Sequence, residues 1–240
     1  MRKEPYAVGN IIHVIKRGAR GLEIVQDPGD RWRFLLMLRH LNDKYQPKDW
    51  FRDLMREGLV KTMERPSFWP EQEHLTKILG FTLMDNHFHL ILEETEEGGI
   101  TNFMKRLCSS MTKGFNERYG EQGSLFQGAY RSVTVSSDRQ LQRLAVYVMV
   151  KNTLEMYPEG GLKEALKDLS IAWEWATRYP YSSLSDYAGE RSSMIVDKSV
   201  LGEIFPTPDI FKEFAFEVMK DHRNKLITPL EGLTLEEPSI

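Results

Sequence analysis

The chain has 240 residues and a mass of 28.0 kDa, with 41% hydrophobic and 28% charged residues, which is typical of a globular protein. No apolar run approaches the roughly 18 residues of a membrane span, and the N-terminus lacks the apolar segment of a signal peptide. Cys108 is the only cysteine, which excludes an intrachain disulfide and a cysteine-based zinc site. We therefore expect a soluble cytoplasmic protein with no membrane partner.

The charge is unevenly distributed along the chain. The formal net charge of −3 argues against a nucleic-acid-binding protein if it is averaged over all residues. However, segments 1–20 and 101–151 are basic, whereas the stretch from 201 onward is acidic. A basic body with an acidic tail fits phosphate binding followed by a peripheral appendage, although a charged helix face is often only solvated.

The first third of the chain predicts a strand, a helix and an irregular insertion. The β-branched run in 6–16 is typical of a buried strand. Apolar residues at helical spacing in 30–45 predict a helix, with Asp30 as its N-cap. The charged, proline-containing segment 46–73 predicts an insertion with one short helix near 50–57.

The next part predicts a hairpin and then a helix, a strand and a second helix. The hairpin turns at Asp85-Asn86. The two strands of the hairpin are expected at 75–83 and 87–93. The helix, the strand and the second helix are expected at 98–118, 132–135 and 138–154. The order strand, helix, strand, strand, helix, strand predicts an α+β fold of the ferredoxin-like, split βαβ kind, with an antiparallel sheet and helices on one face.

A pair of histidines lies in the second strand of the hairpin. His87 and His89 are two residues apart, so they share one strand face while Phe88 points to the other. Two neighbouring imidazoles favour a divalent metal, with further ligands such as the following Glu93 or Glu94. The alternative is that the histidines are ordinary polar residues on an exposed strand face.

Tyr147 is the candidate nucleophile. On the helix 138–154, Arg143 precedes it by one turn and Lys151 follows it by one turn. Nearby cations favour the phenolate and attract phosphate, so Tyr147 could attack a phosphodiester. The alternative is a packed tyrosine with two solvated basic neighbours.

Several motifs resemble, in order and spacing, those of the single-tyrosine His-hydrophobe-His transposases, most closely the REP-associated tyrosine transposases. The resemblance covers about residues 6 to 190. The motifs are His13-Val-Ile-Lys-Arg-Gly18, Met84-Asp-Asn-His-Phe-His-Leu, Gly123-Ser-Leu-Phe-Gln-Gly, Tyr147-Val-Met-Val-Lys-Asn152, Tyr179-Pro-Tyr-Ser-Ser and Asp186-Tyr187.

The resemblance implies a transposase that cleaves and rejoins single-stranded DNA at hairpin-flanked sites. It implies that His87 and His89 bind a divalent metal, Mg or Mn, and that Tyr147 forms a 5′-phosphotyrosine intermediate. It also implies a catalytic domain over 1–160, containing the insertion 46–73, and a helical, acidic appendage over 161–240. Whether the protein acts as a homodimer is left open.

DNA contacts are expected from basic side chains and one aromatic ring, by charge and stacking. They are Arg17, Lys105, Arg106, Lys113, Tyr130, Arg131, Arg143 and Lys151.

The chain departs from the family pattern at two places. Relatives commonly carry an amide four residues after the tyrosine, where this chain has Lys151, and Asn152 follows one position later. We expect Asn152 as the third metal ligand, with an acidic residue or water as alternatives. Relatives also often have Arg where this chain has Ala129, so one DNA contact is expected to be missing.

Two other functions compete with this hypothesis. One is a non-catalytic module that binds single-stranded nucleic acid on the same scaffold. The other is a metal phosphodiesterase that uses water, with Tyr147 only structural. We further expect residues 192–240 to be dispensable for phosphodiester chemistry, because they lie beyond every motif.

Overall fold

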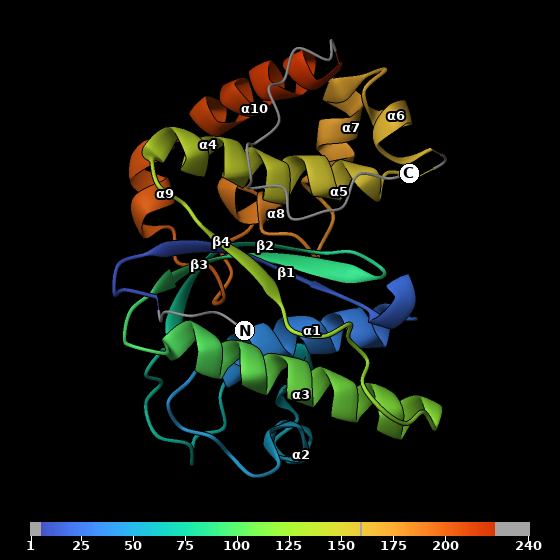
Figure 1. Cartoon of the computed structure of the whole chain (residues 1–240), viewed down its shortest axis with the longest axis vertical. Helices are drawn as coiled ribbons and strands as arrows, with labels where there is room; N and C mark the ends of the chain where they lie inside the picture. Colours follow the sequence, from blue (N-terminus) through green and yellow to red (C-terminus); the bar gives the residue numbers. More distant parts are fainter. Residues whose placement is uncertain (1–5, 159, 224–240) are drawn as a thin grey trace.

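A computed structural model describes residues 6–158 and 160–223. A four-stranded antiparallel sheet lies at the centre, and helices cover both of its faces (Figure 1). The basic residues Arg2 and Lys3, and the part of the acidic tail from 224 onward, lie outside the described residues.

The fold class predicted from the sequence is confirmed. The sheet has the strand order β2-β3-β1-β4, which is the ferredoxin-like arrangement, and β2 contains a bulge between Ile78 and Gly80. The strands are β1 (Ile11–Arg17), β2 (Thr76–Leu83), β3 (His87–Glu94) and β4 (Arg131–Thr134).

The helices fall into two groups along the chain. Those before β4 are α1 (Pro28–Leu41), α2 (Trp50–Arg56) and α3 (Gly99–Tyr119), with short 3₁₀ turns η1 (Ala19–Gly21) and η2 (Leu59–Lys61). Those after β4 are α4 (Asp138–Val146), the π-helical turn η3 (Tyr147–Lys151), α5 (Asn152–Glu155), α6 (Gly161–Ala165), α7 (Leu169–Ala176), α8 (Leu184–Tyr187), α9 (Ser199–Ile204) and α10 (Pro208–Arg223).

One face of the sheet packs against α1 and α3, as the ferredoxin-like prediction requires. Strand alternation sends Val14, Phe88 and Leu90 to this face, and each is fully buried. Phe34 of α1 and Phe103 of α3 meet them in the same core. Burying each such side chain contributes about 1.5–3 kcal/mol, so this core fixes the two crossover helices on the sheet.

The opposite face is also covered, which the expectation of helices on one face did not include. Leu79 and Ile91 of the sheet belong to a second core, together with Leu144 of α4. Phe211 and Met219 of α10 complete that core from the end of the chain. The helices after β4 therefore pack on the sheet (Figure 1). Residues from both sides of the predicted domain boundary at residue 160 belong to this one core.

The start of α1 differs from the sequence prediction. Asp27, not Asp30, is the N-cap: the Asp27 side chain accepts a hydrogen bond of 2.9 Å from the Asp30 N–H. Pro28 at the first helical position has its φ preset for a helix, which moves the start three residues upstream. Asp30 instead forms an ion pair of 2.8 Å with Arg118 of α3.

The insertion contains the single short helix that the sequence predicted, α2. Trp69, near its end, is buried and donates a hydrogen bond of 3.0 Å to Asp53. Among the described residues, no helix is long and apolar enough to cross a membrane.

Candidate active site

The histidine pair lies on the sheet face that is covered by α4 and η3. His87 and His89 do share one face of β3, and their ring centroids are 5.0 Å apart. The pairing of β1 with β3 places Ile15 opposite His89 and Arg17 opposite His87. Opposed residues of antiparallel strands point to the same side, so β1 contributes its odd-numbered residues to this face.

His13 of β1 forms a third member of the cluster. Its Nε2 and His89 Nδ1 share a hydrogen bond of 2.9 Å, and the two rings stack with centroids 5.2 Å apart. His13 and His89 are both fully buried. Because His89 Nδ1 is engaged with His13, Nε2 is the nitrogen of His89 that can bind a metal.

Asn86 fixes the other imidazole. Its Oδ1 accepts a hydrogen bond of 2.6 Å from His87 Nδ1, and its Nδ2 donates one of 3.2 Å to the Gly21 carbonyl. The second bond sets the orientation of the Asn86 amide. His87 therefore carries its proton on Nδ1, which leaves the Nε2 lone pair for a ligand.

Tyr147 lies directly over these histidines. Its ring centroid is 5.6 Å from that of His89 and 6.0 Å from that of His13, both in edge contacts. The Tyr147 side chain is buried, with 7% of its surface exposed. The structure thus brings the candidate nucleophile and the histidine pair together from a helix and a strand that lie far apart in the chain.

The helix that carries Tyr147 widens into a π-helical turn at this residue. The Asn152 N–H bonds to the Tyr147 carbonyl, five residues back, where an α-helix would use four. Thr82 of β2 donates a hydrogen bond of 2.6 Å to the Val148 carbonyl. The Met149 carbonyl likewise accepts one of 2.6 Å from the Thr153 hydroxyl. Side-chain hydroxyls therefore satisfy carbonyls of the widened turn.

Ser182 and Ser183 hold the π-helical turn against the sheet. Ser182 Oγ lies 3.1 Å from Thr82 Oγ1 and donates a bond of 3.3 Å to the Met149 carbonyl. Ser183 Oγ accepts a bond of 2.8 Å from the Phe81 N–H. This serine pair thus links β2 to the helix of Tyr147.

Asn152 is five residues after Tyr147 in the chain, and the π turn places it about one helical turn beyond Tyr147. This position corresponds to the place that the fourth residue would have in an α-helix, one turn beyond Tyr147 on the same side. Asn152 is fully buried, and neither atom of its amide has a hydrogen-bond partner in the described part of the chain. A buried amide without a partner is costly, so this side chain is suited to bind a further ligand.

Lys151 and Arg143 flank Tyr147, as their spacing predicted. Lys151 Nζ lies 4.9 Å from the Tyr147 ring centroid and forms an ion pair with Glu155. Arg143 is partly exposed one turn earlier, and its carbonyl accepts a bond from the Tyr147 N–H.

The acidic residues after the histidine pair have other roles. Glu93 pairs with Lys77 of β2, with an N–O distance of 3.2 Å. The buried Glu94 accepts bonds of 2.8 Å from the Gly98 and Ile100 N–H groups at the start of α3. Within the described residues, no three His, Cys, Asp or Glu side chains form a group that could hold a metal ion.

The predicted DNA contacts divide between the two faces of the sheet. Arg17 and Arg131 lie on the face of the histidine pair, since Arg131 of β4 is opposite Ile15. Lys105 and Lys113 are exposed on α3, and α3 lies across the sheet from α4 (Figure 1). On that side too, Arg106 of α3 donates to the Asp43 carbonyl, and Tyr130 packs against the first core.

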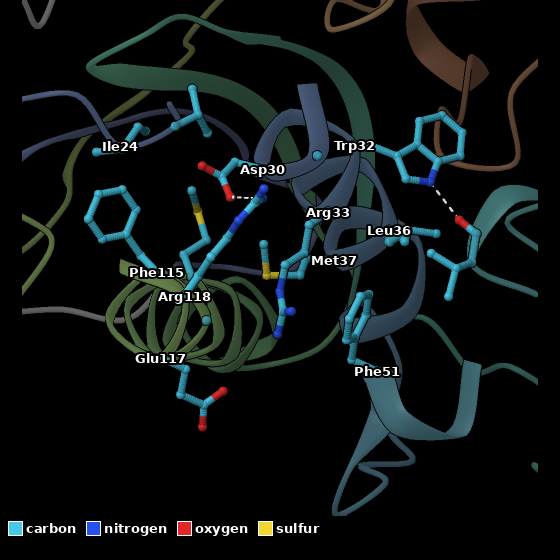
Figure 2. Close-up of a pocket in the computed structure, with 15 residues that line it drawn as sticks. Ile24, Asp30, Trp32, Arg33, Leu36, Met37, Phe51, Phe115, Glu117 and Arg118 are labelled. Atoms are coloured by element: carbon cyan, nitrogen blue, oxygen red, sulfur yellow. Dashed lines mark hydrogen bonds and ion pairs between the residues drawn. The ribbon is translucent and has the colours of Figure 1, made fainter. Parts of the chain in front are cut away.

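A separate cavity of about 450 Å³ lies between α1 and α3 (Figure 2). Arg33 reaches across it and places its guanidinium 4.1 Å from the centroid of the Phe51 ring. Gly114 of α3 leaves room for this guanidinium, because a Cβ there would lie 2.9 Å from Arg33 Cζ. The cavity is distinct from the histidine cluster.

Three residues of this site had no assigned role in the sequence analysis. His13 appeared only within a family motif, Asn86 only as a turn residue, and Thr82 not at all. The odd-numbered positions of the first strand could have indicated His13, if the pairing of that strand with the histidine strand had been known.

The chain is similar to known proteins over part of its length. No curated protein matches the chain. Among solved structures, the chain is similar to a REP-associated tyrosine transposase bound to a REP hairpin, at 10% identity and a TM-score of 0.40, over 82% of this chain and 93% of that one. Residues 59–151 match the family model described as Transposase IS200 like. This matched segment, which contains His87, His89 and Tyr147, is similar to IS200-like transposases.

Proposed function

We propose that this protein cleaves and rejoins single-stranded DNA through a covalent bond between Tyr147 and a 5′-phosphate. The observation that carries the proposal is the edge contact of 5.6 Å between the rings of Tyr147 and His89. It joins a candidate nucleophile to a candidate metal ligand, and both belong to the segment that matches IS200-like transposases.

The proposed reaction is a phosphoryl transfer without redox change. The Tyr147 oxygen loses its proton and bonds to the scissile phosphorus while the bond from phosphorus to the 3′ oxygen breaks. The departing 3′ oxygen takes up a proton and becomes a free hydroxyl. Attack by another 3′-hydroxyl reverses these steps, so strand joining needs no nucleotide cofactor.

The residues present fit a divalent metal, Mg or Mn. His87 and His89 would bind it through Nε2, because Nδ1 of each ring is hydrogen bonded elsewhere. The buried Asn152 amide, without a partner in the described residues, would be the third protein ligand. When bound, the metal would polarise the scissile phosphate as a Lewis acid.

Lys151 would stabilise the reacting tyrosine. A cation beside the Tyr147 ring favours the phenolate over the phenol. Glu155 shares that charge, which holds the ammonium in place and moderates its effect. Lys151 therefore supports the nucleophile, and the metal-ligand role falls to Asn152.

The proposed substrate is single-stranded DNA next to a hairpin. Arg17, Arg131, Arg143 and Lys151 would bind the strand near the reacting phosphate, by charge. The contacts expected from Lys105, Arg106, Lys113 and Tyr130 would have to involve DNA that reaches the other face of the sheet. A homodimer remains a prediction.

The test uses Tyr147→Phe, which removes one hydroxyl. Wild-type protein is incubated with Mn²⁺ and a labelled pool of single-stranded DNA hairpins with unpaired flanks, and covalent adducts are separated in SDS. We expect the adduct to disappear in the variant, because the loss of a nucleophile costs several orders of magnitude in rate. The melting temperature checks that the variant is folded.

Tyr119→Phe serves as a matched control, because Tyr119 lies at the end of α3 and its hydroxyl bonds to Asp30 at 2.7 Å. This variant is expected to form the adduct. An adduct that persists in Tyr147→Phe would show that another tyrosine reacts. DNA binding by the wild type without any adduct or cleavage would instead favour the non-catalytic binding module.

A further inference from the structure

Three arginines line a cavity of about 350 Å³ at the end of β1. They are Arg17 at the end of β1, Arg20 in the turn η1, and Arg131 at the start of β4. Gln127 and Gly128 contribute the opposite wall. No acidic residue lines this cavity.

The cavity is on the same sheet face as Tyr147. Arg17 is opposite His87 in the pairing of β1 with β3, and Arg131 is opposite Ile15 in the pairing of β1 with β4. Ile15 is in turn opposite His89. A strand of DNA held at the histidine pair would therefore have its next phosphates within reach of these arginines.

Backbone hydrogen bonds join the two loops that form the cavity. The Ala19 N–H donates to the Leu125 carbonyl at 2.9 Å, and the Gln127 N–H donates to the Arg17 carbonyl at 3.0 Å. Lys16 Nζ also donates to the Gly128 carbonyl. The arginines are thus mounted on a framework that is tied together at several points.

Asn86 connects this framework to the histidine pair. The same amide that fixes His87 through Oδ1 binds the Gly21 carbonyl through Nδ2. The turn that carries Arg20 and the imidazole of His87 are therefore positioned by one side chain.

Arg20 has a backbone conformation that a non-glycine residue adopts only at a cost. Its φ is 57° and its ψ is 19°, in the left-handed region, and its side chain is exposed. Strained backbone of this kind occurs often at functional sites, so the conformation is consistent with a role for the guanidinium in binding.

We propose that this arginine cavity binds a backbone phosphate of the DNA strand adjacent to the phosphate that Tyr147 attacks, with Arg20 as a direct ligand. Guanidinium groups present planar donors that match phosphate oxygens, and a cavity without acids favours an anion. This inference rests on the proposed function for the identity of the ligand. It adds Arg20 to the DNA-binding residues and assigns Arg17, Arg20 and Arg131 to one phosphate site.

The test measures DNA binding without cleavage, in full-length protein that carries Tyr147→Phe. A fluorescent single-stranded oligonucleotide with a hairpin is titrated by anisotropy at several salt concentrations. Adding Arg20→Gln is expected to weaken binding by about 3- to 10-fold at 0.1 M salt and to reduce the salt dependence by about one phosphate contact. The control Lys163→Gln removes one charge from an exposed position on α6 and should bind as the parent does.

A second variant separates binding from folding. Arg20→Gly removes the guanidinium and relieves the left-handed backbone, so its melting temperature should be no lower than that of the parent. It should nevertheless lose as much affinity as Arg20→Gln. Equal affinity of either variant and the Lys163→Gln control would overturn the proposal.

Neutral methylphosphonates at single positions of the oligonucleotide locate the contact. The Tyr147→Phe protein should bind more weakly when the methylphosphonate lies next to the cleavage site. The protein that also carries Arg20→Gln should show no further loss of affinity from that same methylphosphonate. If millimolar inorganic phosphate alone displaces the oligonucleotide, the cavity is a site for free anions, and the proposal is contradicted. If the wild-type protein forms no covalent adduct but Arg20→Gln still weakens DNA binding, the proposed strand cleavage is wrong and the proposed phosphate site is retained.

Discussion

The proton arrangement in the histidine cluster is set residue by residue. For His89 to bind a metal through Nε2 as a neutral ring, its Nδ1 must carry the proton and donate it to His13 Nε2, 2.9 Å away. His13 then carries its own proton on Nδ1. His13 is therefore a positioning residue, which acts on a metal through His89.

His13→Leu tests this role. Loss of the acceptor should weaken Mn²⁺ binding by about 10- to 100-fold, as is usual when a ligand-orienting partner is removed. His13→Gln keeps an acceptor and should retain most of the affinity. Calorimetric titration of Mn²⁺ without DNA measures both, and unchanged affinity in His13→Leu would remove His13 from this role.

His40 makes the stability of the fold depend on pH. This residue of α1 is fully buried, and burial, followed by the charges of Arg39 and Arg65, lowers its pKa to about 3. Neither ring nitrogen has a hydrogen-bond partner among the described residues. Between pH 6.5 and 3, the unfolded chain binds a proton at this position and the folded chain does not, so stability falls as pH decreases through this window.

The expected size of the effect is about 1.4 kcal/mol per pH unit below 6.5, or about 2 kcal/mol at pH 5. His40→Phe removes the titrating group, so this variant should lose about 2 kcal/mol less than the wild type between pH 7 and pH 5. Urea unfolding at the two pH values checks this. Equal losses in both proteins would show that His40 does not titrate in this window.

Among the elements, the π-helical turn determines which residue lies one turn after Tyr147. Lys151 occupies the position where the sequence resemblance implies an amide. The extra residue of the π turn gives Asn152 the corresponding place after Tyr147. The hydroxyls of Thr82 and Ser182 satisfy carbonyls in the turn. The turn thus acts as a one-residue insertion that the neighbouring strand supports.

Deletion of Lys151 tests this interpretation. The helix should close into a regular α-helix with the asparagine four residues after Tyr147 and with Leu154 still directed into the second core. We expect Mn²⁺ affinity within a few-fold of wild type and a similar melting temperature. Deletion of Arg143, in the regular α4, should instead rotate Tyr147 and everything after it by about 100° and destabilise the protein. Equally severe effects of the two deletions would contradict the insertion model.

At the scale of the whole molecule, the sheet lies between two cores, and the helix of Tyr147 belongs to the second one. Leu201 of α9, and Phe211 and Met219 of α10, are buried in that core beside α4. The functional boundary at residue 160 and the dispensability of residues 192–240 for phosphodiester chemistry stay predictions. The packing leads us to expect that residues 192–223 stabilise the helix that carries Tyr147.

Truncation after Arg191 is therefore expected to destabilise the fold. Each large apolar side chain that is lost contributes about 1.5–3 kcal/mol, and several together approach the total stability of a typical domain, about 5–15 kcal/mol. Thermal unfolding followed by circular dichroism should show a large fall in melting temperature. A truncated protein with wild-type stability would support the peripheral appendage.

Two neighbouring residues of α10 give a matched comparison. Phe211→Ala removes a fully buried ring and should cost about 3–5 kcal/mol. Ile210→Ala alters a side chain that is 43% exposed and should cost less than about 1 kcal/mol. Urea unfolding of both variants distinguishes a core helix from a loosely attached one.

The sequence by itself determined the features that depend on local periodicity. Strand alternation placed His87 and His89 on one face, and helical spacing placed Lys151 one turn after Tyr147. The order of strands and helices was sufficient for the ferredoxin-like sheet because the local patterns of the strands and helices are strong. The start of α1 was misplaced, since the sequence offers both Asp27 and Asp30 as caps.

Only the tertiary structure decided which distant residues complete the site. His13 is 76 residues from His89, and only the pairing of β1 with β3 brings the two rings together. The π turn likewise depends on hydroxyl groups supplied by Thr82 and Ser182, so helical periodicity alone could not predict it. The basic residues of α3 and those near Tyr147 have the same charge, so the sequence does not distinguish them. The sheet separates the two groups, because the crossover helix α3 covers one face and α4, which follows the last strand, covers the other.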